Sequence, residues 1–128
     1  MLHVPGLYIA DSDGKGRGVF TARELSKGDV IEFCPLVFIP DKEQNCIHKS
    51  VLHDYYFLSP PPNSKMCIVL GYGSIYNHAF QPNADIVFDL PNRHLEIHCI
   101  LDIEPGDEIL IDYTGGLKDA PKLWFDPI

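Results

Sequence analysis

Prolines and glycines interrupt this chain so often that long regular elements are excluded. The 128 residues include 11 prolines and 10 glycines. Because proline lacks a backbone donor and glycine favours turns, we expect short elements joined by turns rather than a helical bundle. A hydrophobic fraction of 45% is sufficient for a core, and the length predicts a single domain over residues 1–128.

The charge balance favours a basic partner over nucleic acid or a membrane. The formal net charge is -8, and the 10 lysines and arginines are scattered rather than clustered. Phosphate binding needs clustered cations, so direct nucleic-acid binding is not expected, whereas an acidic surface suits a Lys/Arg-rich peptide. No apolar run approaches membrane-spanning length and no signal peptide is recognised, so we expect no membrane contact.

The four cysteines predict an intracellular protein. Cys34, Cys46, Cys67 and Cys99 form no Cys-x-x-Cys pair, and three of them lie in apolar runs, where a thiol behaves as a small hydrophobe. We therefore expect free thiols in a reducing compartment. The location would be the cytoplasm, or the nucleus if the host is eukaryotic.

Short runs of Val, Ile, Phe and Tyr bounded by turn residues predict a mostly β protein with minor helix. The expected strands are 6–10, 18–22, 29–39, 84–90, 94–101 and 108–113.

The connections between these runs are also indicated by the sequence. "PNR" predicts a β-hairpin over 84–101, and the Gly-Asp pairs of 25–31 and 103–109 predict tight turns in which glycine supplies a positive φ. A helix is expected within 45–59, anchored by the aromatics of 54–57 and ended by "PPPN", and "GYGSIYNH" could hold another helical turn.

One polar segment, "GYGSIYNHAFQPN" at 71–83, is difficult to explain as scaffold. It follows the apolar run "MCIVL" and brings Asn77, His78 and Asn83 beside the expected core. Buried polar groups need hydrogen-bond partners, so the segment is either a satisfied loop or a site. For His78 taken alone, a structural role is favoured over a catalytic one.

Three further patterns are ambiguous when taken singly. The glycines of "DGKGRGVF" favour a plain hairpin turn over a ligand loop. Tyr113, beside a Gly-Gly pair, favours packing over a pocket hydroxyl. His94 and His98 share a strand face with Glu96, and a solvated face is favoured over a metal site, so no metal ligand is predicted.

The order and spacing of these patterns resemble the SET-domain protein lysine methyltransferases. The matching blocks are Gly16-Arg17-Gly18, Asn77-His78 through Asn83, and "GDEILIDY" at 106–113. The resemblance covers about 6–116, leaving 117–128 as an aromatic tail. It implies small curved sheets in a β-clip-like fold with a C-terminal pseudo-knot, and a size typical of compact viral and bacterial members.

The resemblance also implies an activity and its residues. The expected reaction transfers a methyl group from S-adenosylmethionine to a lysine of a basic, histone-like peptide, without a metal. Tyr113 would be catalytic, near the transferring methyl. The implied cofactor-binding residues are Lys15, Gly16, Arg17, Gly18, Asn77, His78, Tyr113 and Trp124, and the implied substrate-channel residues are Tyr72, Tyr76 and Ile86.

The sequence departs from the family pattern at several positions. Ala79 replaces the usual hydroxyl residue after Asn-His, and Ile86 stands where some relatives carry a channel Tyr. These departures keep a second hypothesis open, in which a non-catalytic SET-fold module recognises a basic tail or a partner protein. Three further questions remain open from the sequence. The substrate could be a non-histone protein, the protein could form a homodimer, and Trp124 could either stack on adenine or dock the tail.

Overall fold

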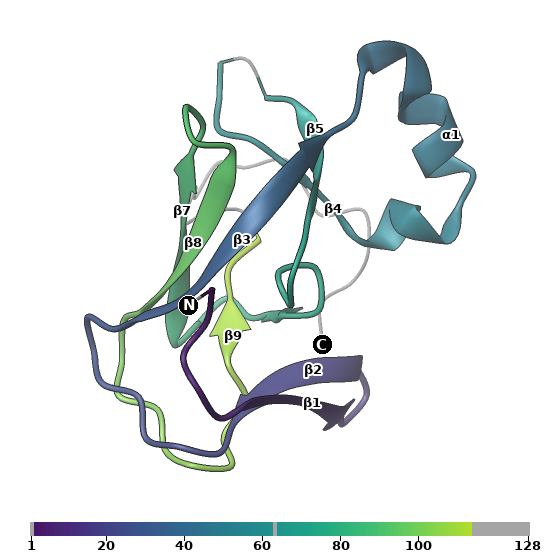
Figure 1. Ribbon diagram of the computed structural model, residues 1–128. Coiled ribbons are helices and arrows are strands. Elements are labelled where there is room, and N and C mark those ends of the chain that lie inside the picture. Colours follow the sequence, from purple (N-terminus) through teal and green to yellow (C-terminus); the bar gives the residue numbers. More distant parts are fainter. Residues whose placement is uncertain (1, 63, 114–128) are drawn as a thin grey trace.

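The computed structural model describes residues 2–62 and 64–113 and is built mainly of short strands (Figure 1). The elements, in chain order, are β1 Leu7–Ser12, β2 Gly16–Thr21, β3 Val30–Phe38, the 3-10 helix η1 Asp41–Glu43, α1 Gln44–His48, the 3-10 helix η2 Val51–Asp54, β4 Tyr56–Leu58, β5 Met66–Val69, β6 Asn77–His78, β7 Ala84–Asp89, β8 His94–Cys99 and β9 Leu110–Ile111. The expectation of a mostly β fold with curved sheets is confirmed. Of the helices within the described ranges, none has the length and apolar character needed to cross a bilayer.

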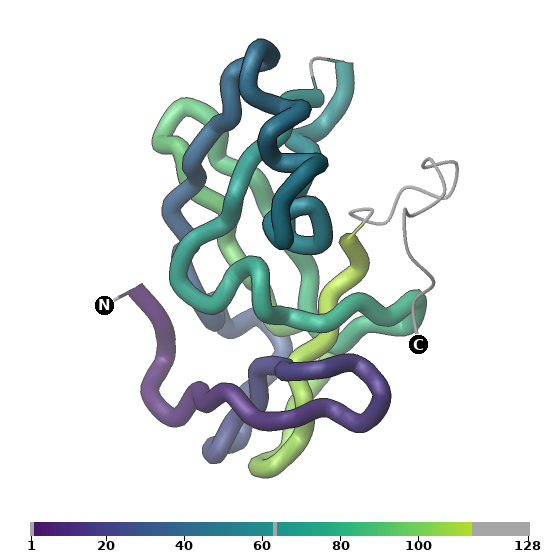
Figure 2. The backbone as a smooth tube through the Cα atoms, turned by 90° about the vertical axis from the view of Figure 1, so that its right-hand side faces the viewer, coloured from purple at the N-terminus to yellow at the C-terminus, as the bar shows by residue number. Residues whose placement is uncertain are grey.

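The strands form three sheets. A central sheet has the order β4-β5-β3-β8-β7 and is antiparallel throughout, and β1 and β2 form a separate hairpin. The third sheet pairs β6 with β9 in parallel, although more than 30 residues separate them in the chain. Both ribbon and tube views show β9 rising from the β1–β2 hairpin toward the central sheet (Figures 1 and 2). The resemblance implied a C-terminal pseudo-knot, and the part of it that lies within the described residues is this pairing of β9 with β6.

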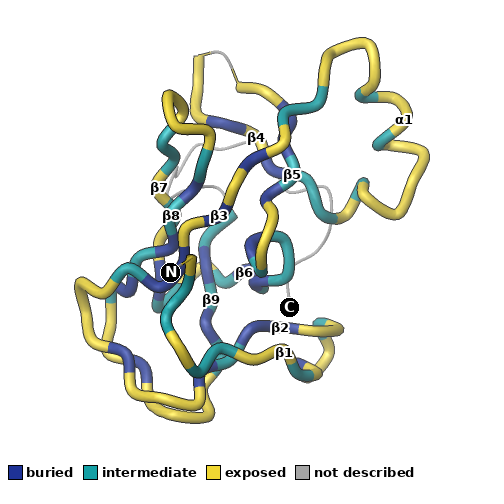
Figure 3. Tube along the Cα trace, viewed as in Figure 1, coloured by how far each residue is buried: buried dark blue, intermediate teal, exposed yellow. Residues whose placement is uncertain are grey.

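The core lies on one face of the central sheet, because side chains alternate along each strand. On β8, Leu95 and Ile97 are fully buried, whereas His94 and Glu96 between them are partly exposed. Buried positions lie mainly along β2, β3, β5 and β8 (Figure 3). Cys34, Cys67 and Cys99 are among them, and Cys46 is exposed; all four thiols are free, as expected.

A bulge in β3 brings a carboxylate into the interior. The register with β8 shifts between Val30 and Glu32, so that Ile31 and Glu32 are both buried although they are consecutive. The Glu32 carboxylate accepts hydrogen bonds from the Tyr76 hydroxyl at 2.7 Å and from the Tyr72 amide at 3.0 Å. Among the described residues, no cationic side chain pairs with it. Two donors from the 71–83 segment therefore satisfy a buried acid of β3.

The short helix expected within 45–59 is present as α1, but it ends well before the "PPPN" that was expected to end it. Helix α1 ends at His48, the short η2 follows, and residues 56–58 form strand β4 against β5. Phe57, expected to anchor a helix, is instead a buried strand residue opposite Cys67. Pairing with β5 outweighs the local helical pattern. The segment "GYGSIYNH" forms turns leading into β6, and the expected helical turn is absent from it.

The predicted hairpin and tight turns are confirmed. β7 pairs with β8 in continuous register from Ala84↔Cys99 to Asp89↔His94. Gly28 and Gly106 both adopt positive φ, +98° and +90°, which a residue with a Cβ rarely does. The last expected strand is shorter than 108–113, because β9 covers only Leu110–Ile111.

Replacing Tyr76 by Phe should destabilise the protein by about 2 kcal/mol, because a buried carboxylate then loses one of its two donors. Urea unfolding measures the change. Tyr8→Phe is the matched control, since that ring is 39% exposed on β1 and its loss of a hydroxyl should change stability by less than about 0.5 kcal/mol. Equal effects of the two substitutions would contradict a structural role for the Glu32–Tyr76 contact.

Candidate active site

Three segments that are distant in sequence meet where β2, β6 and β9 lie side by side. Asn77 on β6 donates through Nδ2 to the Arg17 carbonyl at 3.1 Å and to Glu108 Oε2 at 2.7 Å. Ser12, at the end of β1, donates to the other Glu108 oxygen at 2.6 Å. Glu108 therefore joins the β1–β2 hairpin to β6.

The side chains of Asn77 and Glu108 leave no room for a side chain at position 18, which is a glycine. A Cβ at Gly18 would lie 2.1 Å from Glu108 Oε2 and 2.7 Å from Asn77 Nδ2. At position 16, by contrast, a Cβ would meet no atom within 4 Å. The φ of Gly16 is +76°, however, and any other residue type would be strained in that backbone conformation. The two glycines of the predicted Gly-x-Gly loop thus have different roles: Gly18 admits the Asn77–Glu108 contact, and Gly16 shapes the turn next to open space.

Asn83 fixes the position of the chain entering β9. Its side chain accepts from the Leu110 amide at 2.8 Å and donates to the Glu108 carbonyl at 2.9 Å. These contacts hold β9 parallel to β6, with Asn77 opposite Leu110 and His78 opposite Ile111. The half-buried amide side chains of Asn77 and Asn83 therefore serve to hold a crossing strand.

His78 orients the residues that follow β9. Its Nδ1 accepts from the Tyr113 amide at 2.9 Å, so the ring carries its proton on Nε2, which is buried and has no partner among the described residues. Burial lowers the pKa of His78 below its usual range, and Lys15 adds to this against the opposing effect of Asp112. A neutral, structural imidazole agrees with the role favoured from the sequence.

Tyr113 lies against residues 76–78 with its hydroxyl directed inward. The hydroxyl donates a hydrogen bond to the Tyr76 carbonyl, and the ring packs edge-on against Phe57. Burial, with smaller contributions from Glu108 and Tyr55, raises the pKa of Tyr113 to about 12. The hydroxyl therefore stays protonated at neutral pH and acts as a dipole and donor, not as a base.

The remaining sequence-predicted positions are less closely grouped. Lys15 and Arg17 lie on the β1–β2 hairpin beside Gly16. Tyr72 and Ile86 are half-buried and pack against the core. The side chain of Tyr76 is fully buried, so that its carbonyl, and not its hydroxyl, faces Tyr113. Trp124 lies outside the described residues.

The sequence-based prediction missed three residues that organise the site. Ser12 and Glu108 form the junction with Asn77, and Glu32 holds Tyr76 from the opposite side. Glu108 lies inside a recognised motif, so a functional role could have been suspected from its place there. No local signal marks Ser12 or the burial of Glu32, which arise from contacts 96 and 44 residues apart.

Comparison with known proteins identifies the family. The family model described as "SET domain" matches residues 16–114, most of the chain. The chain belongs to the SET-domain family. A Schizosaccharomyces pombe histone-lysine N-methyltransferase specific for H3 lysine-37 is 29% identical over 121 residues, covering 94% of this chain and 77% of that protein.

Two further SET proteins are similar to the chain. The S. pombe histone-lysine N-methyltransferase set9 is 28% identical over 118 residues, covering 88% of this chain and 26% of that longer protein. A crystal structure of a candidate histone methyltransferase of Plasmodium falciparum superposes with a TM-score of 0.64 at 34% identity, covering 84% of this chain and 92% of that one. The resemblance drawn from the motifs is thereby confirmed.

Gly18→Ala should destabilise the protein by about 2 kcal/mol, because the new Cβ displaces the Glu108 carboxylate. In a Glu108→Ala background the same substitution should cost at least about 1 kcal/mol less, a coupling that a double-mutant cycle in urea measures. Gly16→Ala is the control, and its cost should be unchanged in that background to within about 0.5 kcal/mol. Additive behaviour of Gly18→Ala with Glu108→Ala would refute the packing role of Gly18.

Proposed function

We propose that this SET domain is an S-adenosylmethionine-dependent protein-lysine N-methyltransferase. The observation that carries the proposal is the meeting of Gly16–Gly18, Asn77–His78 and Tyr113 through direct hydrogen bonds, in a chain whose curated relatives are histone-lysine N-methyltransferases. Methyl transfer is an in-line displacement, which requires mainly alignment of donor and acceptor, and that is what a rigid junction of remote segments supplies.

The residues present fit the proposed cofactor. Asn77 uses its Nδ2 for protein contacts, and its Oδ1, which has no hydrogen-bond partner among the described residues, can accept from an ammonium group. The neighbouring Glu108 carboxylate favours positive charge, and the space at Gly16 allows close backbone approach. Lys15, Gly16, Arg17, Gly18, Asn77 and His78 would hold the cofactor, with Trp124 as a further contact from the tail. When bound, S-adenosylmethionine supplies a methyl group on a cationic sulfur.

Tyr113 would position the reacting groups rather than move a proton. Its protonated hydroxyl and the Tyr76 carbonyl lie together, and such oxygens can align a polarised methyl group through weak C–H···O contacts. The substrate lysine must arrive uncharged, and nearby positive charge together with desolvation lowers its pKa. Tyr72, Tyr76 and Ile86 are proposed to line its approach. The transfer itself requires no metal.

The substrate proposed is a basic peptide segment in an extended conformation. The net charge of -8 favours lysine- and arginine-rich sequences, as found in histone tails. A host without histones would instead supply another basic protein. The same proposal includes an intracellular location, nuclear in a eukaryotic host, a homodimer, and no direct contact with nucleic acid.

The activity can be tested with labelled S-adenosylmethionine and core histones or a lysate of the host. Wild-type protein should label at least one protein on lysine. Cofactor binding without any labelling would instead support the non-catalytic module that Ala79 and Ile86 leave open.

Tyr113→Phe should reduce kcat by about 100-fold while leaving cofactor affinity within about threefold, because the lost hydroxyl aligns reacting groups and does not fill the cofactor site. Calorimetry gives the affinity, and labelling under saturating cofactor gives kcat. Tyr8→Phe serves as the control and should retain full activity. An unaltered kcat in Tyr113→Phe would rule out the proposed alignment role.

A further inference from the structure

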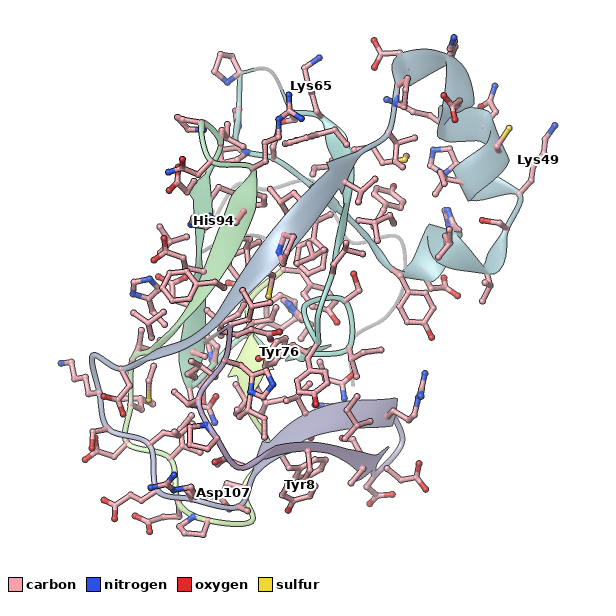
Figure 4. The ribbon with its side chains drawn as sticks, viewed as in Figure 1. Tyr8, Lys49, Lys65, Tyr76, His94 and Asp107 are labelled. Carbon is pink, nitrogen blue, oxygen red and sulfur yellow. The ribbon has the colours of Figure 1, made fainter. Side chains whose placement is uncertain are left out.

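The closed end of the β7–β8 hairpin carries a cluster of ligand-type side chains that the proposed reaction does not use. Asp89 and His94 face each other across the two strands, and Glu96 is two residues further along β8. His94 Nε2 lies 3.0 Å from Glu96 Oε2 and 3.3 Å from Asp89 Oδ2, and the three ligand atoms all lie within 4.8 Å of one another. Figure 4 shows His94 on this hairpin and Tyr76 nearer the middle of the molecule.

Two carboxylate oxygens of this cluster compete for one hydrogen on the His94 ring. A neutral or charged imidazole carries at most one hydrogen on Nε2, yet two carboxylate oxygens converge on that nitrogen. Only one of them can accept that hydrogen at a time, so two negative groups face the same ring nitrogen. A cation placed among the three atoms would satisfy all of them at once.

Each carboxylate is already held in position by a second partner. Glu96 Oε1 contacts His98 Nε2 at 2.9 Å, and Asp89 Oδ2 accepts from Asn92 Nδ2 at 2.8 Å. The His94 ring is set perpendicular to Phe33 of β3, with ring centroids 5.7 Å apart. Outer partners of this kind orient the ligands of protein metal sites.

We propose that Asp89, His94 and Glu96 form a binding site for a divalent first-row transition metal of the zinc class. The 3.0 and 3.3 Å separations are close to the edge of about 3.3–3.6 Å that follows from tetrahedral geometry with metal–ligand bonds of about 2.0–2.2 Å. An imidazole nitrogen among the ligands favours zinc, nickel or copper over magnesium or calcium. The side chains of Asp89, His94 and Glu96 are 28%, 24% and 22% exposed, so water can complete the coordination.

The spacing on β8 alone did not indicate this site. His94 and His98 are too far apart along a strand to share an ion, and a solvated face was therefore favoured. Asp89 supplies the third ligand from the opposite strand, and the hairpin register that brings it to His94 emerges only with the fold. His98 becomes an outer partner of Glu96 and not a ligand.

Zinc titration by calorimetry tests the proposal, with chelator-treated protein. The parent should be His48→Ala/His53→Ala, because those two rings also bring nitrogens within 3.0 Å of each other and could bind zinc independently. This parent should bind one zinc ion in a saturable isotherm. Adding His94→Ala should remove that binding, and His98→Ala, which loses an outer partner, should weaken it about 10- to 100-fold.

Asp85→Asn is the matched control. Asp85 lies on the same face of β7 as Asp89, opposite His98, but it is not one of the three proposed ligands. The zinc affinity of this variant should therefore stay within about twofold of that of the parent. Far-UV circular dichroism without metal checks folding, and Asp89→Asn gives the same test if His94→Ala does not fold. Zinc should also raise the melting temperature of the parent but not of the His94→Ala protein.

The proposal is overturned if the parent binds no zinc at millimolar concentration, or if adding His94→Ala leaves the isotherm unchanged. In either case the cluster is a hydrogen-bond and ion-pair network only, with His94 between two carboxylates. Equal affinity for magnesium and zinc would also contradict it, because the imidazole ligand would then contribute nothing.

Discussion

The interaction on which the rest of the structure depends is the hydrogen bonding of two acidic side chains to the polar strip 76–78. Glu32 accepts from the Tyr76 hydroxyl on one side, and Glu108 accepts from Asn77 on the other. Each carboxylate belongs to a segment at least 31 residues away in the chain. The strip is thus fixed from both sides, and the Tyr76 carbonyl and His78 ring can then receive Tyr113 in a defined position.

This arrangement explains why a small protein places polar groups next to its core. A short parallel pair such as β6–β9 provides few backbone hydrogen bonds, so it cannot hold two remote segments together by itself. The side chains of Asn77, His78 and Asn83 supply the missing contacts, each with a partner from the last described segment. The same groups leave Asn77 Oδ1 and the space at Gly16 available for a ligand.

The departures from the family pattern leave this framework intact. The backbone amide of Ala79 donates to the Ile111 carbonyl at 2.9 Å, a contact that needs no hydroxyl side chain. Ile86 packs against the core from β7. Neither residue interrupts a hydrogen bond of the junction, and this favours a working site over a scaffold that has lost its chemistry.

Structural features that depend on neighbouring residues could be predicted from the sequence, whereas those that depend on contacts between remote strands could not. Strands with β-branched runs, the 84–101 hairpin and the turns at Gly28 and Gly106 follow from nearest-neighbour preferences. Strand β4 could not be predicted, because its identity depends on pairing with β5 and not on its own helical pattern. The roles of Glu32, Ser12 and Asp89 also could not, because each depends on a register or bulge that only the assembled sheets define.

The most direct measurement of the central claim is a calorimetric titration of S-adenosylmethionine into the wild-type protein and into Asn77→Ala. We expect one bound equivalent for the wild type and a loss of affinity of at least about tenfold for Asn77→Ala, since both a ligand acceptor and the link to Glu108 are removed. A folded wild-type protein that takes up no S-adenosylmethionine, or an Asn77→Ala protein that binds it equally well, would show that Asn77 is not part of a cofactor site.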